Sequence, residues 1–218
     1  MNPAEDSAAP APGTAPLVVM GVTGSGKSTV GAALSRRLRV PFADADDFHS
    51  EANIAKMSAG IPLDDDDRLP WLRAIGAWLA EHAATGGVAS CSALRRSYRD
   101  ILRESAPTVS FVHLHGEIDA VRRRVAGRPG HFMPSSLVDS QFRTLEPLGP
   151  DEHGIVLDFA RPVGELVDAY LAAAAVPRTR PDPYPTGPAD PGGPRDTGEA
   201  GSPPPRSQMR VPWAWCGR

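Results

Sequence analysis

Short apolar runs and amphipathic stretches alternate along the central part of the chain. Apolar runs that end at glycine or polar residues are typical of buried strands, and they are found at residues 17–20, 40–44, 88–91, 109–115 and 154–159. Apolar residues at helical spacing predict helices at 28–38, 68–83, 98–105, 117–127, 135–146 and 162–174. This alternation predicts an α/β fold in which helices cover both faces of a parallel five-stranded sheet.

Both ends of the chain differ in composition from this central part. Residues 1–16 are rich in alanine and proline, and residues 177–218 hold 11 of the 24 prolines. Such segments bury too little apolar surface to offset the conformational entropy lost on ordering. We therefore expect a disordered N-terminal arm, one folded domain at 17–176 and a disordered tail.

Charge and cysteine content narrow the class of function. The net charge is −3 and the pI about 6.1, without the basic excess of proteins that bind nucleic acid or membrane surfaces. No run approaches the roughly 18 apolar residues of a membrane span, and the N-terminus lacks the pattern of a signal peptide. Cys91 and Cys216 lie far apart, which argues against a disulfide framework and favours the cytoplasm.

The stretch GVTGSGKS at 21–28 matches the phosphate-loop pattern G-x-x-x-x-G-K-[ST] and lies between a predicted strand and a predicted helix. Glycines let backbone N–H groups curl around phosphate oxygens, and the helix N-terminus adds partial positive charge. We expect Lys27 to reach the β- and γ-phosphates and Ser28 to bind Mg²⁺. The predicted nucleotide-binding residues are Gly21, Val22, Thr23, Gly24, Ser25, Gly26, Lys27, Ser28 and Thr29.

A second polar segment follows the second predicted strand. Ligands of doubly wound sheets lie beyond the carboxyl ends of the strands, so Asp44 and Asp46 should face the same crevice as the phosphate loop. Transfer to a hydroxyl needs one carboxylate to orient or deprotonate it and another to support Mg²⁺. We assign Asp46 to the first role and Asp44 to the second, although the sequence leaves this division open. His49, Asn53 and Lys56 would contact an anionic acceptor; the plainer interpretation is a solvated loop.

Arginines follow the third predicted strand, in CSALRRSYRD at 91–100. Arginine binds carboxylates through a planar fork of donors. Arg95 or Arg99 is therefore expected to hold a carboxylate of the acceptor, although an exposed basic helix face would give the same pattern.

A basic stretch with several glycines and prolines lies between two predicted helices. It predicts a small lid at about 124–134, with Arg124 and Arg128 neutralising charge on the transferring phosphoryl group. His131, in the same stretch, is assigned to the acceptor site. A plain basic loop is the alternative interpretation.

Taken together, these segments resemble the gluconokinase family of small P-loop sugar-acid kinases. The blocks that carry the resemblance are GVTGSGKST, DADDFH with EANIAKM, GIPLDDDDRLPWL, CSALRRSYRDILR and GHFMPSSLVDSQFRTLEPL. The resemblance covers roughly residues 17–175 and implies a three-layer P-loop kinase fold with a lid, usually as a homodimer. It also implies ATP- and Mg²⁺-dependent transfer to the 6-hydroxyl of D-gluconate.

The chain departs from the family pattern at three positions. Ala45 stands where the family usually has glycine, Ser50 where it usually has proline, and Arg95 where lysine is common. Ala45 adds a methyl group at a tight turn, which tests whether the backbone there has a negative φ. None of the three removes a charged group from the predicted site.

The acidic segment before the second long helix has two interpretations. By the resemblance, Asp65, Asp67 and Arg68 organise the acceptor pocket; alternatively, the aspartates form a solvated turn and Asp67 caps the helix. Two other functions also remain open: a kinase for another small acid such as shikimate, or an inactive nucleotide-binding regulator. The presence of Lys27, Ser28, Asp44 and Asp46 argues against the regulator.

Overall fold

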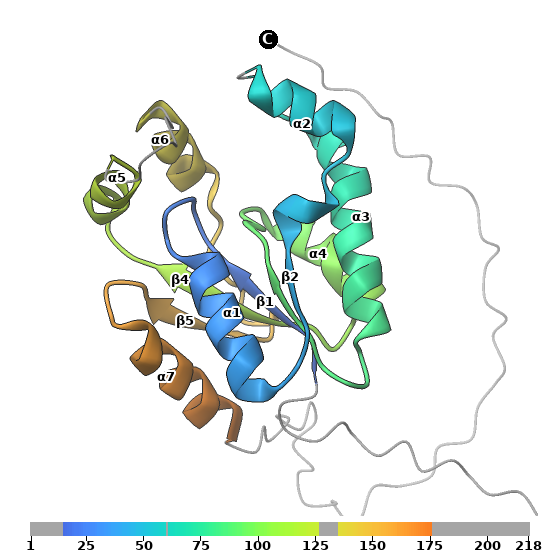
Figure 1. Cartoon of the computed structure of the whole chain (residues 1–218), viewed down its shortest axis with the longest axis vertical. Coiled ribbons are helices and arrows are strands. Elements are labelled where there is room, and N and C mark those ends of the chain that lie inside the picture. The colour runs from blue at the N-terminus through green and yellow to red at the C-terminus, as the bar shows by residue number, and fades with distance from the viewer. Residues whose placement is uncertain (1–14, 60, 127–134, 176–218) are drawn as a thin grey trace, which may run out of the picture. The chain divides into compact units, whose positions relative to one another are not determined.

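The computed structural model describes residues 15–59, 61–126 and 135–175 (Figure 1). In this part of the chain, five strands form one fully parallel sheet in the order β2-β3-β1-β4-β5. The strands are β1 (Leu17–Met20), β2 (Phe42–Asp44), β3 (Val88–Ser90), β4 (Ser110–His115) and β5 (Gly154–Asp158). The predicted α/β fold and all five predicted strands are confirmed.

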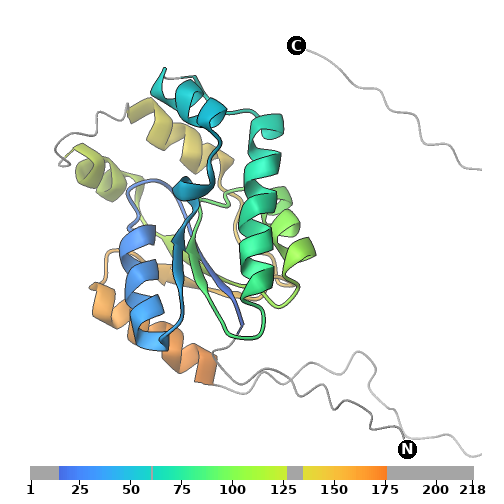
Figure 2. The same ribbon diagram turned by 45° about the vertical axis from the view of Figure 1, so that its right-hand side comes forward.

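Helices cover both faces of this sheet. They are α1 (Lys27–Leu38), α2 (Glu51–Ser58), α3 (Asp65–Glu81), α4 (Arg96–Ser105), α5 (Ile118–Ala126), α6 (Ser135–Thr144) and α7 (Val163–Ala175), with a short 3₁₀ helix η1 (Ala45–Phe48). Helices α1 and α7 pack on one face, and α3 and α4 pack on the other (Figures 1 and 2). The sheet therefore forms the middle of three layers.

Strand β1 shows why a continuous apolar run forms a central strand. Leu17 and Val19 belong to the hydrophobic cluster under α1 and α7, whereas Val18 and Met20 belong to the cluster under α3 and α4. Because successive side chains of a strand point to opposite faces, only a run without polar positions suits a strand covered on both sides. Strand β1 lies between β3 and β4, so a crevice opens beyond its carboxyl end.

Helix α3 begins earlier than its apolar pattern predicts. Asp64 is the N-cap residue: its carboxylate accepts from the Asp67 N–H at 2.9 Å, and the Asp67 carboxylate accepts from the Asp64 N–H at 3.1 Å. This reciprocal capping box satisfies two donors at the start of the helix. Asp67 thus takes part in capping, as one interpretation held, but from the third position inside the helix.

Helix α2 and η1 were not predicted. Asn53 is the only buried residue of α2, so no apolar stripe marks the helix in the sequence. The one feature of the sequence that could have predicted the start of α2 is Ser50, a typical N-cap residue. Its hydroxyl accepts a hydrogen bond from the Asn53 N–H at 3.2 Å. Ala45 lies inside η1 and does not have a positive φ, so the backbone accommodates the extra methyl group.

Several predictions lie outside the described residues. They are the N-terminal arm at 1–14, the tail from residue 176 and the predicted lid beyond residue 126. Within the ranges that the structure describes, no helix is long and apolar enough to cross a membrane.

Candidate active site

The loop between β1 and α1 has the backbone geometry of an anion-binding cradle. The backbone φ angles of Gly21, Gly24 and Gly26 are 139°, 75° and 97°. Residues other than glycine rarely adopt such positive φ values. A Cβ atom at Gly26 would meet nothing within 4 Å, so the entrance to the helix is open. The first turn of α1 has no acidic residue to compete for its free N–H groups. The cradle therefore suits a phosphate group.

Ser28 and Asp44 meet at the carboxyl edge of the sheet. The Ser28 hydroxyl donates to the Asp44 carboxylate at 2.6 Å, which joins the start of α1 to the end of β2. Mg²⁺ is commonly held by one or two protein oxygens together with water and substrate phosphates. No group of three or more acidic, histidine or cysteine side chains suited to a metal occurs among the described residues. This pair therefore fits a largely hydrated Mg²⁺ ion.

Asp44 and Asp46 differ in how firmly they are held. The Asp44 carboxylate accepts both the Ser28 hydroxyl and the Asp46 N–H, the latter at 3.2 Å. The Asp46 side chain is exposed and makes no hydrogen bond or ion pair with the rest of the described chain. The geometry therefore leaves Asp46 available to a hydroxyl in the crevice, while Asp44 is fixed beside Ser28.

His49 is stacked on Trp71 of α3. Their ring centres are 4.6 Å apart and the planes differ by 6°, while the Trp71 indole donates to the Ala45 carbonyl at 2.6 Å. Burial lowers the pKa of His49; Asp46 opposes this shift and Arg68 adds to it. His49 is therefore neutral near pH 7 and lies within the electrostatic reach of both charged groups. Its buried Nδ1 atom has no hydrogen-bond partner in the described part of the chain.

Four side chains form a charged group beside His49, which we name the Asp65 cluster: Asp65, Arg68, Arg95 and Tyr98. The Asp65 carboxylate accepts from the Tyr98 hydroxyl at 2.6 Å and from Arg95 at 2.9 Å. Arg68 donates to the Tyr98 hydroxyl at 3.3 Å and lies 3.6 Å from Asp65. The hydrogen bond from Tyr98 lowers the pKa of Asp65, and the two arginines add to this effect. Two guanidinium groups share one carboxylate, so the cluster keeps one positive charge for an anion.

Arg99 does not face the crevice, so its predicted role in substrate binding is not supported. The side chain is fully buried and forms an ion pair with Glu152, with bonds of 2.6 and 2.9 Å. Its other bonds go to backbone carbonyls of Ala93, Leu94, Glu146 and Pro147. Arg99 lies on the inner face of α4, where it fixes the segment after α6 and has no donor left for a ligand.

Arg124 lies on the nucleotide side of the crevice, in the last turn of α5. It donates to the Phe159 carbonyl at 2.8 Å and to the Ser25 carbonyl at 3.4 Å, and its guanidinium is 4.8 Å from the centre of the Phe159 ring. It lines a cavity of about 310 Å³ beside the phosphate loop, together with Thr29 and Arg161. Arg124 is thus part of a helix rather than of a lid, and its catalytic role stays a prediction.

Other predicted residues have different outcomes. Arg128 and His131 lie outside the described residues. Lys56 pairs with the Asp67 carboxylate at 2.6 Å, and Asn53 donates to the Asp67 carbonyl at 3.0 Å. These two side chains join α2 to α3 instead of pointing at an acceptor, so their predicted contact with substrate is not supported.

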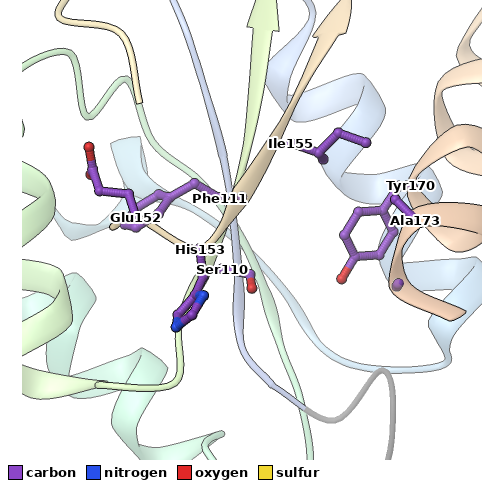
Figure 3. A pocket seen from close by; sticks show the side chains of 9 residues that line it. Ser110, Phe111, Glu152, His153, Ile155, Tyr170 and Ala173 are labelled. Atoms are coloured by element: carbon purple, nitrogen blue, oxygen red, sulfur yellow. The ribbon is translucent and has the colours of Figure 1, made fainter. Parts of the chain in front are cut away.

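A second cavity, of about 280 Å³, lies at the opposite edge of the sheet (Figure 3). It is lined by the first residues of β4 and β5, Ser110 and Gly154, and by Tyr170 of α7. Ligands of open α/β sheets bind at the carboxyl ends of the strands. This cavity at the amino ends is therefore separate from the site described above.

Comparison with known proteins agrees with this geometry. Residues 23–145 match the family model described as shikimate kinase. The thermoresistant gluconokinase of Escherichia coli strain K12 is 41% identical over 157 residues, which cover 71% of this chain and 90% of that protein. The chain belongs to the gluconokinase family. A gluconokinase of Gluconobacter oxydans is 49% identical over 62% of this chain and 78% of its own length.

The fold of the chain also matches that of a solved gluconokinase structure. The gluconokinase of Sinorhizobium meliloti 1021 is 50% identical, covers 74% of this chain and 92% of its own length, and superposes with a TM-score of 0.69. The chain is thus an enzyme of the gluconokinase family, with a P-loop kinase fold and use of a nucleotide. The sequence predicted that the phosphate loop and Asp44 face one crevice, and the structure joins them through Ser28. It did not predict the contacts of Tyr98 and Trp71 beside this crevice, because their partners lie far away in the chain.

Proposed function

We propose that this chain transfers the γ-phosphoryl group of ATP to the 6-hydroxyl of D-gluconate, which yields 6-phospho-D-gluconate and ADP. The contact between Ser28 and Asp44 carries this proposal, because it joins the phosphate loop to the acceptor segment at 2.6 Å. Gluconate has a carboxylate at one end and a primary hydroxyl at the other. The crevice offers a surplus cation in the Asp65 cluster and a free carboxylate at Asp46.

Each side chain has one part in the proposed reaction. Ser28 and Asp44 hold Mg²⁺, which supplies charge neutralisation at the phosphates when bound. Lys27 and Arg124 add positive charge along the phosphate loop. Asp46 orients the 6-hydroxyl and accepts its proton. Arg68 and Arg95 bind the substrate carboxylate. His49, stacked on Trp71, forms an uncharged surface beside them. Catalysis is then mostly positioning and electrostatic stabilisation.

The direct test is a coupled assay of ADP release with ATP, Mg²⁺ and gluconate. Asp46→Asn should lower kcat by about 10²-fold or more if Asp46 acts as the base. Asp47→Asn is the matched control, since Asp47 is also exposed and lies one residue away. Near-full activity of the Asp46 variant, with the control equally active, rules out the proposed base.

A shikimate kinase is the second candidate, because residues 23–145 match the model described by that name. Turnover with shikimate but not with gluconate would establish this alternative. Nucleotide binding without transfer to any polyhydroxy acid would instead indicate an inactive regulator. We also propose that the enzyme is cytoplasmic and that it forms a homodimer. Light scattering of the purified chain tests the homodimer directly.

A further inference from the structure

One N–H group of the phosphate loop already has a side-chain partner from a distant helix. The backbone N–H of Thr23 donates to the Oε1 atom of Gln141, in α6, at 2.6 Å. Thr23 lies in the middle of GVTGSGKS, between the glycines whose backbone shapes the cradle. The two residues are 118 positions apart, so the contact depends on the packing of α6 over the loop.

The chemistry of Gln141 suits it to a phosphate group as well as to the loop. A carboxamide accepts through its oxygen and donates through its nitrogen. With Oε1 on the Thr23 N–H, the Nε2 donors lie beside the loop and have no partner in the part of the chain that the structure describes. Gln141 is also only half-buried and carries no charge. An anion placed at the loop would therefore meet a free neutral donor.

The far end of α6 is joined to the acceptor side. The Glu146 N–H donates to the Leu94 carbonyl at 2.8 Å, and the Glu146 carboxylate accepts from the Arg96 N–H at 2.5 Å. These two contacts flank Arg95, a member of the Asp65 cluster. Gln141 thus lies on a helix whose following residues are joined to the segment that holds Arg95.

We propose that Gln141 is the positioning residue for the terminal phosphate and makes the site distinguish ATP from ADP. Without nucleotide, Gln141 accepts the Thr23 N–H. With ATP, its Nε2 donates to a γ-phosphate oxygen and holds that group toward Asp46. With ADP, Gln141 keeps only its contact with Thr23. This inference rests on nucleotide binding at the phosphate loop, which is one part of the proposed function.

Calorimetric titration tests the inference. The protein is titrated with ADP and, separately, with a non-hydrolysable ATP analogue, in both cases with Mg²⁺ present and the acceptor absent. Gln141→Leu removes both hydrogen-bonding groups at nearly constant size. It should weaken binding of the ATP analogue about tenfold, the effect of one lost hydrogen bond to a charged group, and change ADP binding less than twofold. Gln141→Glu keeps an acceptor for Thr23 but adds a negative charge, so both nucleotides should bind more weakly, and the loss should be clearly larger for the ATP analogue than for ADP.

The controls separate this role from a structural one. Ser140→Ala changes an exposed neighbour on the same helix and should alter neither affinity. If the leucine variant fails to fold, the glutamate variant and Gln141→Asn allow the same comparison of the two nucleotide affinities. The asparagine side chain is one methylene group shorter, so its amide no longer reaches the phosphate. Equal weakening of both nucleotides, or no weakening at all, overturns the inference. Failure of the wild-type chain to bind either nucleotide removes the proposed function itself and this inference with it.

Discussion

Replacement of Arg99 by methionine should destabilise the fold without changing how gluconate binds. The change removes six hydrogen bonds, two to Glu152 and four to backbone carbonyls. It leaves the fully buried Glu152 carboxylate with only Arg96, 3.7 Å away, as a cation. Breaking a buried ion pair in this way costs about 3–5 kcal/mol. A domain of this size loses about 2–4 °C in Tm per kcal/mol, so Tm should fall by roughly 6–20 °C.

The loss should also depend on pH. Burial by itself would raise the pKa of Glu152, but hydrogen bonds from Arg99 and from the Gly149 N–H outweigh it and lower that pKa. A lowered carboxyl pKa contributes stability that is present above the pKa of the unfolded chain, about 4.3, and is lost as the pH falls. In the methionine variant, burial instead favours the protonated carboxyl. The difference in stability between the two proteins should therefore shrink as the pH falls from 7 to 4.

Thermal unfolding followed by circular dichroism, together with KM for gluconate, decides between the two roles of Arg99. Arg99→Lys keeps the charge without the planar fork and should give an intermediate Tm. Arg99→Met combined with Glu152→Met should recover much of the loss, because no unpaired charge remains buried. A methionine variant with unchanged Tm and a tenfold higher KM would refute the structural role and restore Arg99 to the substrate site.

Two further predictions follow from the site and the core. Tyr98→Phe removes the hydroxyl that joins Asp65 to Arg68; KM for gluconate should rise about fivefold, as one lost hydrogen bond implies, and an unchanged KM would exclude the Asp65 cluster from acceptor binding. His113→Leu concerns stability: burial, with help from His115 and Arg99, lowers the pKa of His113 from 6.5 to about 4. As the pH falls between these values the unfolded chain takes up the proton first, so the wild type loses stability that the leucine variant keeps. Urea unfolding at pH 7 and 4.5 measures this difference, and equal losses in both proteins would contradict it.

The position of a residue can be predicted from the sequence when its partners are close to it in the chain, and not when they are distant. Strand β1 was predictable because burial on both faces demands a run without polar residues, and the phosphate loop because its function requires a fixed local pattern. Arg95 and Arg99 look alike in the sequence. Only the packing of α4 against the segment around Glu152 sends one to the crevice and the other to the core.

Helix α2 contributes no side chain to either hydrophobic cluster of the described chain. It is held to α3 by Asn53 and Lys56, which both bind Asp67, and its apolar side chains Ile54 and Met57 are about half exposed. Mutations on the outer face of α2 therefore escape the packing constraints that act on the core. This helix is therefore joined to the acceptor side by polar contacts with Asp67, while packed apolar side chains hold the sheet beneath the phosphate loop.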